Sequence, residues 1–287
     1  MVVVVNGTFA VVFARDLIRH KAEVVRDLVQ NVGKTLIQVV AAGVIFFLST
    51  FGISDFAIST VLYRQMRWVD DAKLPGTLNT QCVIPVAVMA LAYISSIQVE
   101  LATLVLCIGA QVLGAYIGPR FVVRMNVDLI KKFIIAGLLV AAGLLLLNKF
   151  GFYPAGGTET GLHGWKFALV GILSLIYGAL NNVGIGSYAM TMATVYALGL
   201  NPNVAFPIMM GACTFSVPVG SMQFIKFDSY SRKMTLLTST IGLIGVLIAV
   251  YIVKSLDVSM LQWVVAVVIL YAAFSMIAEQ MKKRKTA

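Results

Sequence analysis

Ten apolar segments follow one another along the chain, separated by short polar connections. They cover approximately residues 35–52, 56–68, 75–94, 101–118, 133–148, 167–183, 187–200, 206–225, 234–253 and 259–278. A helix that crosses a bilayer needs about 20 mainly apolar residues, so most of these segments are long enough to cross. Two of them, 56–68 and 187–200, are short for a full crossing, and each follows a break that contains glycine. We therefore expect an all-α, polytopic membrane bundle, in which each short segment is either a short span or one arm of a bent hairpin.

Composition supports a membrane protein and excludes several classes of site. Hydrophobic residues make up 60% of the 287 residues and charged residues 12%, whereas soluble domains carry about 25% charged residues. The net charge of +10 comes from basic residues in short clusters between the apolar segments, so we expect no nucleic-acid partner. Cys82, Cys107 and Cys213 lie in apolar segments at spacings unlike a metal or redox motif, and both histidines lie outside these segments. We expect neither a metal nor a cofactor.

The basic residues also predict how the chain is oriented. If the amino terminus is cytoplasmic and the chain crosses at each segment, all but three of the 22 Lys and Arg residues fall on the cytoplasmic side; the exceptions are Lys149, Lys166 and Lys254. This bias predicts a multi-pass protein of the cytoplasmic membrane with both termini inside. Residues 1–34 would form a cytoplasmic segment, in which about Phe13 to Gln30 has the pattern of an amphipathic helix on an anionic membrane surface.

The two halves of the membrane region resemble each other at an offset of about 132 residues. Gly52-Ile53-Ser54 aligns with Gly184-Ile185-Gly186, and Pro75 aligns with Pro207. Because each half has an odd number of segments, the second half must enter the membrane from the opposite side. Inverted repeats with broken helices are a recurring plan of secondary transporters, which bind substrate near the midplane. The chain then divides into a first repeat at 35–148, an external loop at 149–166, a second repeat at 167–279 and a basic cytoplasmic tail at 280–287.

The breaks read FGISDF in the first half and VGIGSY in the second, and two longer stretches are GLNPNVAFPIMMGACTF and GAYIGPRFVVRMNVDLIKKFIIAGLLVAAGLLLL. With these motifs, roughly residues 35–280 resemble the TauE/SafE family of membrane permeases, which includes proposed exporters of sulfite and small organosulfonates. The resemblance implies a permease with a glycine-rich break in each half. Ser54-Asp55 and Ser187 stand where the family has glycine, so the resemblance leaves the substrate open.

Small polar residues gather at the breaks and in the proline-led helices that follow them. A helix N-terminus carries unpaired N–H groups and a partial positive charge, so two such ends at the bundle centre would suit an anion. The expected substrate-binding residues are Gly52, Ser54, Asn79, Thr80, Gln81, Asn181, Asn182, Gly184, Gly186, Ser187, Cys213, Thr214 and Ser216. For any one of the polar side chains, a hydrogen bond between neighbouring helices is the alternative interpretation.

Asp55 is the acid that lies between two candidate helices, whereas the other acids lie in flanks or at segment ends. An ionised acid at the bilayer centre costs about 2.5–3.5 kcal/mol, which indicates a role. We expect Asp55 to carry a coupling proton or to bind a coupling cation such as sodium. Its alternative role is to cap the helix that begins at Phe56.

These features favour a secondary transporter that moves a small anion by alternating access, coupled to an ion. Sulfite, an organosulfonate, a related sulfur oxyanion and a carboxylate are the candidate substrates. An anion channel with the same architecture is the first alternative. A membrane-embedded enzyme is the second, and we do not expect it because the apolar segments and the breaks between them contain one acid, Asp55, and no histidine. The expected partners are the small anion, the bilayer, the coupling ion and, in a possible homo-oligomer, a second copy of the chain.

Overall fold

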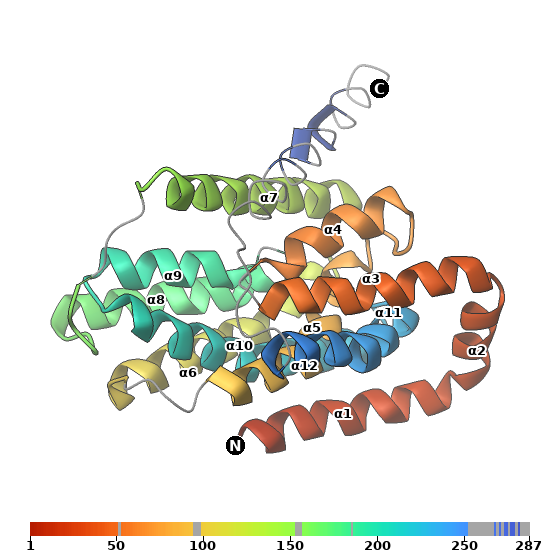
Figure 1. Ribbon diagram of the computed structural model, residues 1–287, viewed down its shortest axis with the longest axis horizontal. Helices are drawn as coiled ribbons and strands as arrows, with labels where there is room; N and C mark the ends of the chain where they lie inside the picture. The colour runs from red at the N-terminus through yellow and green to blue at the C-terminus, as the bar shows by residue number, and fades with distance from the viewer. Residues whose placement is uncertain are drawn as a thin grey trace.

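The computed structural model describes residues 1–50, 53–93, 99–152, 157–184 and 186–251, together with 267, 270, 273–274, 276–278 and 281. Within these residues the regular structure is helical, apart from an isolated bridge between Glu159 and Leu200 (Figure 1). The helices are α1 (Val2–Arg19), α2 (Lys21–Val29), α3 (Val32–Thr50), α4 (Asp55–Gln65), α5 (Leu74–Tyr93), α6 (Leu101–Val122), α7 (Val127–Lys149), α8 (Gly164–Asn181), α9 (Ser187–Ala197), α10 (Pro202–Lys226), α11 (Arg232–Leu237), a π-helical turn (Thr238–Gly242) and α12 (Leu243–Tyr251).

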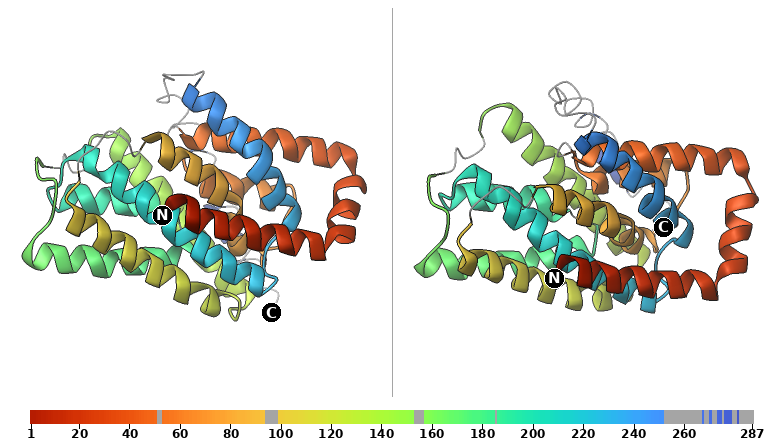
Figure 2. Two further views of the ribbon diagram at one scale, coloured as in Figure 1. Left: turned by 90° about the horizontal axis from the view of Figure 1, so that it is seen from below. Right: turned by 60° about the horizontal axis from the view of Figure 1, so that its bottom comes forward.

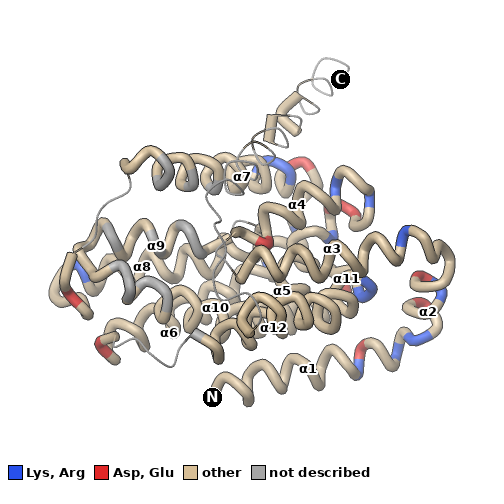
Figure 3. Tube along the Cα trace, in the orientation of Figure 1, with Lys and Arg blue, Asp and Glu red and all other residues tan. Residues whose placement is uncertain are grey.

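Six helices among the described residues are long and apolar enough to cross a membrane, which confirms a multi-pass helical protein. They span Val32–Thr50, Leu74–Ala92, Leu101–Val122, Gly164–Asn181, Pro207–Lys226 and Arg232–Tyr251. The expected last segment, 259–278, falls mostly outside the described residues, and the described part of it is helical. Lys and Arg gather at the end of the bundle where α3 begins and α4 ends, whereas few lie at the end where α8 begins (Figure 3).

The proline-led helices α5 and α10 form the centre of the bundle. They pack against each other, and most of their residues are buried, whereas most residues of α3 and α8 are not. Around them, α6 packs against α8 and α10, and α3 packs against the π-helical turn and α12 (Figure 2). Pro75 lies in the first turn of α5, where its missing N–H is not needed. Pro207 lies one turn inside α10, because that helix begins at Pro202, earlier than the expected start at 206.

Each short helix folds back along the helix before it. The Nζ atom of Lys34, near the start of α3, donates to the carbonyl of Arg67, just beyond α4, at 3.3 Å. In the second half Lys166, near the start of α8, donates to the carbonyl of Leu198, just beyond α9, at 3.0 Å. Both pairs are therefore antiparallel helical hairpins, and α4 and α9 return to opposite ends of the bundle (Figure 1).

The amino-terminal segment differs from the sequence prediction. Instead of one amphipathic helix from about Phe13 to Gln30, there are two helices that meet at His20. The first, α1, lies along α10 and α5 (Figure 2) and buries Phe9 and Phe13. The prediction was wrong because the apolar residues that precede Phe13 extend the helix and give it a face that packs on the bundle.

An ion pair fixes the end of α1 to the bundle. Arg232 Nε donates to Asp16 Oδ2 at 2.7 Å, and the Tyr230 hydroxyl donates to the same oxygen. Burial raises the pKa of Asp16, but the hydrogen bonds from Arg232 and Tyr230 and the charge of Arg232 outweigh it, so this pKa lies below its usual value. Asp16 is therefore ionised at neutral pH, and the pair it forms holds α1 against α11.

Candidate substrate site

The two breaks meet inside the bundle. A Cβ atom placed on Gly186 would lie 3.6 Å from Ser54 Oγ and 3.7 Å from the Cβ of Phe56. Gly184 has φ +97°, a conformation that side chains other than glycine rarely adopt. The second break therefore needs glycine at position 184 for its backbone turn, whereas a Cβ at Gly186 would lie in ordinary van der Waals contact with the first break. Gly52 lies outside the described residues.

The first short helix begins with a buried acid that forms no ion pair with a described Lys or Arg. Ser54 is the N-cap of α4, where its Oγ accepts from the backbone N–H of Ala57 at 3.3 Å. Asp55 is the first residue of the helix, so the alternative in which Asp55 caps it is not the arrangement found. The Asp55 side chain is 3% exposed, and Ser49 Oγ donates to its Oδ1 at 3.4 Å. Its Oδ2 atom has no hydrogen-bond partner among the described residues.

The second short helix repeats this arrangement with neutral groups. Ser187 is the first residue of α9, and its backbone N–H donates to Asn181 Oδ1 at 3.2 Å. Its Oγ shares a hydrogen bond of 3.2 Å with Cys213 Sγ of α10. In both halves, a side chain near the end of the long helix thus bonds to the residue that starts the short helix six positions later. One N–H group of the α9 terminus is already satisfied, so an anion there would use the groups that remain.

Two asparagines join the halves at the same depth. Asn181 Nδ2 donates to Asn79 Oδ1 at 2.9 Å, and Asn79 Nδ2 donates to the carbonyl oxygens of Asn181 at 3.0 Å and Pro75 at 2.9 Å. Both side chains are buried. Because an unpaired amide in such a place is costly, this reciprocal pair ties α5 to the end of α8 beside the second break.

A polar face of α4 was not predicted from the sequence. Asp55, Ser59 and Tyr63 recur at a spacing of four, which places them on one face of the helix. Gln81 Nε2 of α5 donates to Ser59 Oγ at 2.9 Å, and the Tyr63 hydroxyl donates to Gln81 Oε1. Gln81, one of the expected substrate-binding residues, therefore bonds to α4. The four-residue spacing of Asp55, Ser59 and Tyr63 in the sequence could have predicted that Ser59 and Tyr63 share a helix face with Asp55.

Other expected site residues make contacts away from the breaks. Thr80 Oγ1 shares a hydrogen bond of 2.6 Å with Thr235 of α11. Asn182 Nδ2 donates to the carbonyl of Gly178 at 2.7 Å, and the carbonyl of Thr214 accepts from Asn6 Nδ2 of α1 at 3.2 Å. Ser216 is buried in α10. The hydrogen bond of Thr80 joins two helices, as in the alternative interpretation of single polar residues. The Asn182 Oδ1 and Thr214 Oγ1 atoms are buried and have no hydrogen-bond partner among the described residues.

We predict that Asn79 and Asn181 act as one unit in stability. Asn79→Ala and Asn181→Ala should each lower the free energy of unfolding in detergent by about 1–2 kcal/mol, because each leaves one polar atom of the other buried amide without its partner. The double variant should lose less than the sum, with a coupling energy of about 1 kcal/mol. Asn126→Ala, which removes a cap from the exposed start of α7, is the control and should add independently to Asn79→Ala. Additive losses for the Asn79 and Asn181 pair would contradict the reciprocal bond.

The comparisons with known proteins agree with this architecture in the second half of the chain. The family model described as Sulfite exporter TauE/SafE matches residues 167–287, a range that includes α8, the second break, α9 and α10. No curated protein and no solved structure matches the chain. The resemblance to the TauE/SafE family, a family of membrane transporters rather than enzymes, is thus confirmed over residues 167–287.

Proposed function

We propose that the chain is a secondary transporter that carries a small sulfur oxyanion, such as sulfite or an organosulfonate, across the cytoplasmic membrane by alternating access. A related carboxylate is the other candidate substrate. The contact between the two breaks carries this proposal: Gly186 lies against Ser54, next to the buried and half-paired carboxylate of Asp55. Irregular backbone at membrane depth is tolerated where it is buried in protein or lines a cavity, and transporters use such broken helices to bind substrate.

The two halves are, on this proposal, inverted repeats. The helices α4 and α9 have 11 residues each and start at 55 and 187, while α3 and α8 start at 32 and 164, which is the same offset. The lysine that closes each hairpin, Lys34 or Lys166, recurs at that offset as well. Because the two hairpins return to opposite ends of the bundle, one half can open the centre to one side and the other half to the other side.

The burial of the centre favours a transporter over an anion channel. Asn79, Gln81, Asp55 and Ser187 are all nearly inaccessible to solvent. A channel needs a continuous path in its conducting state, whereas an alternating-access transporter passes through states in which its centre is closed. The lipid contact is provided by exposed apolar side chains on α3, α6 and α8.

Coupling to a proton follows from the chemistry of Asp55. No described Lys or Arg forms an ion pair with it, so an ionised Asp55 would repel an anion at the breaks. A protonated Asp55 is neutral and can donate a hydrogen bond to the anion from Oδ2. An anion and a proton would therefore bind together, with positive charge from the N-termini of α4 and α9. Sodium remains the alternative coupling ion, and it is separated from the proton by the experiment on Asp55.

We predict that Asp55→Asn abolishes the accumulation of sulfite driven by a pH gradient in proteoliposomes, because asparagine cannot release or take up a proton. Exchange of sulfite for sulfite should persist, since asparagine resembles the protonated acid, and this exchange shows that the variant is folded. Asp55→Glu should retain part of the driven uptake. Glu159→Gln, which removes an exposed acid at the other end of the bundle, should behave as wild type. Driven accumulation by Asp55→Asn, or accumulation by wild type with a sodium gradient alone, would contradict proton coupling at Asp55.

The orientation is also a proposal, supported by the cations gathered at one end of the bundle (Figure 3). A cysteine introduced at Met66, which is 45% exposed just beyond α4, should react with an impermeant thiol reagent only in inside-out vesicles. A cysteine at Glu159 should react only in right-side-out cells. The three native cysteines are buried and should give little background. The reverse pattern would place the amino-terminal half the other way round.

A further inference from the structure

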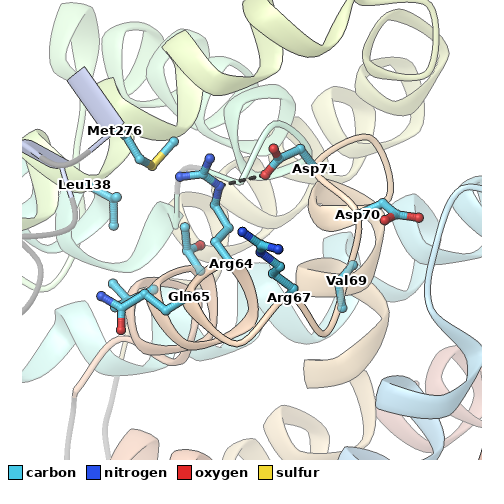
Figure 4. Close-up of a pocket in the computed structure, with 10 residues that line it drawn as sticks. Arg64, Gln65, Arg67, Val69, Asp70, Asp71, Leu138 and Met276 are labelled. Atoms are coloured by element: carbon cyan, nitrogen blue, oxygen red, sulfur yellow. Dashed lines mark hydrogen bonds and ion pairs between the residues drawn. The ribbon is translucent and has the colours of Figure 1, made fainter. Parts of the chain in front are cut away.

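A cavity of about 500 Å³ opens at the end of the bundle where α4 ends (Figure 4). Its walls are α4, the connection at 66–73, Leu138 of α7 and Met276. Its inner residues include Thr60 and Val61, whose side chains are buried. Thr60 lies five positions after Asp55, which is about 7.5 Å along a helix. The cavity thus leads from the surface to within about one and a half turns of the break.

A carboxylate is held at this cavity by two cations from different helices. Arg64 Nε of α4 donates to Asp71 Oδ1 at 2.6 Å, and Lys131 Nζ of α7 lies 3.1 Å from Asp71 Oδ2. Burial raises the pKa of Asp71, but the hydrogen bonds and charges of Arg64 and Lys131 outweigh it, so this pKa lies below its usual value. Asp71 is ionised at neutral pH. Its two oxygens occupy the positions that an oxyanion would take between these cations.

A second arginine faces the same space. Figure 4 shows the guanidinium of Arg67 beside the side chain of Arg64, while Asp70 points away from both. Arg67 forms no ion pair with any acid of the described residues. Lys34 is also near, because its Nζ donates to the carbonyl of Arg67. The cations around the cavity therefore outnumber its acids, Asp70 and Asp71, and Arg67 is available for an anion from solution.

The ion pairs of Asp71 also join α4 to α7, two helices that would move apart during alternating access. Asp71 connects the end of α4 to α7 through Lys131. The helix α7 packs against both short helices, α4 and α9. Release of Asp71 from Lys131 would therefore remove one contact between α7 and the α4 hairpin, beside the cavity that leads toward Asp55.

We propose that this cavity is the cytoplasmic entrance of the anion path: Arg64 and Arg67 bind the incoming anion, and Asp71 keeps the entrance closed by occupying Arg64 and Lys131 in its place. The role as an entrance rests on the proposed transport function, whereas the binding of an anion by the cavity does not. An oxyanion that takes Arg64 displaces Asp71 and opens the contact between α4 and α7. The cavity thus couples the arrival of substrate to opening.

The first experiment measures binding without transport. The thermal stability of purified protein is followed as sulfite is added, for wild type, Arg67→Gln, Asp71→Asn and the control Lys132→Gln. Lys132 is an exposed cation next to Lys131 on α7. Arg67→Gln should raise the sulfite concentration for half-maximal stabilisation about tenfold, because it removes a charged hydrogen-bond donor. Asp71→Asn should lower that concentration, since an internal competitor is lost, and Lys132→Gln should not change it.

The second experiment measures sulfite uptake from each side of proteoliposomes with known orientation. Arg67→Gln should raise the KM about tenfold on the cytoplasmic side and leave kcat from that side unchanged. For uptake from the opposite side the KM should stay the same and kcat should fall by the same factor, because the equilibrium across the membrane fixes the ratio of kcat/KM in the two directions. Arg67→Lys should raise the cytoplasmic KM less than Arg67→Gln does, because lysine keeps the positive charge. An equal change of KM on both sides, or no change, would overturn the entrance. An unchanged binding response in the first experiment for both Arg67→Gln and Asp71→Asn would overturn the anion site.

The two proposals fail in different ways. If wild type binds sulfite with the expected responses of the variants but transports no sulfur oxyanion, the transport function is wrong and the anion site stands. If wild type transports sulfite by the Asp55-dependent route but the Arg67 and Asp71 variants match the Lys132→Gln control in both experiments, the entrance is wrong and the transport function stands.

Discussion

The fold depends on one constraint: backbone groups that are not paired within a helix must find partners inside the protein when they lie at membrane depth. Two helices of this chain are interrupted inside the bundle, at Ser54 and at Gly186, and each interruption exposes the first N–H groups of a short helix. Ser54 and Asn181 each satisfy one of these groups. The breaks also bury one another. Much of the polar chemistry at the centre is thus already used by the protein, whereas Oδ2 of the buried Asp55 carboxylate has no hydrogen-bond partner among the described residues.

Charge is distributed differently at the junction of the two breaks and at the cavity beyond α4. Basic residues surround the cavity beyond α4, whereas the junction of the breaks has an acid and no paired cation among the described residues. An anion drawn to Arg64 and Arg67 would next meet Asp55, which repels it unless a proton is bound. Cations that attract an anion at the cavity, and an acid at the breaks that repels it unless protonated, are consistent with a coupled transporter. A site for unregulated anion flow would be expected to carry cations at both levels.

The sequence predicted those features that depend on strong local patterns. Apolar length predicted the six helices of the described residues that are long enough to cross a membrane. The glycine motifs predicted where α4 and α9 begin, and the position of Asp55 between two apolar segments drew attention to it as an acid in apolar surroundings. The sequence did not predict α1, because the apolar residues before Phe13 acquire a partner only when α10 and α5 come together. For the same reason Thr80, Asn182 and Thr214 could not be told apart from Asn79 and Ser187. Each has a suitable side chain, and only the neighbouring helix decides whether it faces a break or a packing contact.

The central claim is that substrate passes through the junction of the two breaks. Sulfite exchange by Gly186→Val in proteoliposomes tests it most directly, because the added side chain would enter the space between Gly186, Ser54 and Phe56. Gly109→Val is the matched control, since a Cβ at Gly109 meets nothing within 4 Å. The account predicts that folded Gly186→Val loses exchange while Gly109→Val keeps it. Exchange by Gly186→Val at the wild-type rate would contradict the account.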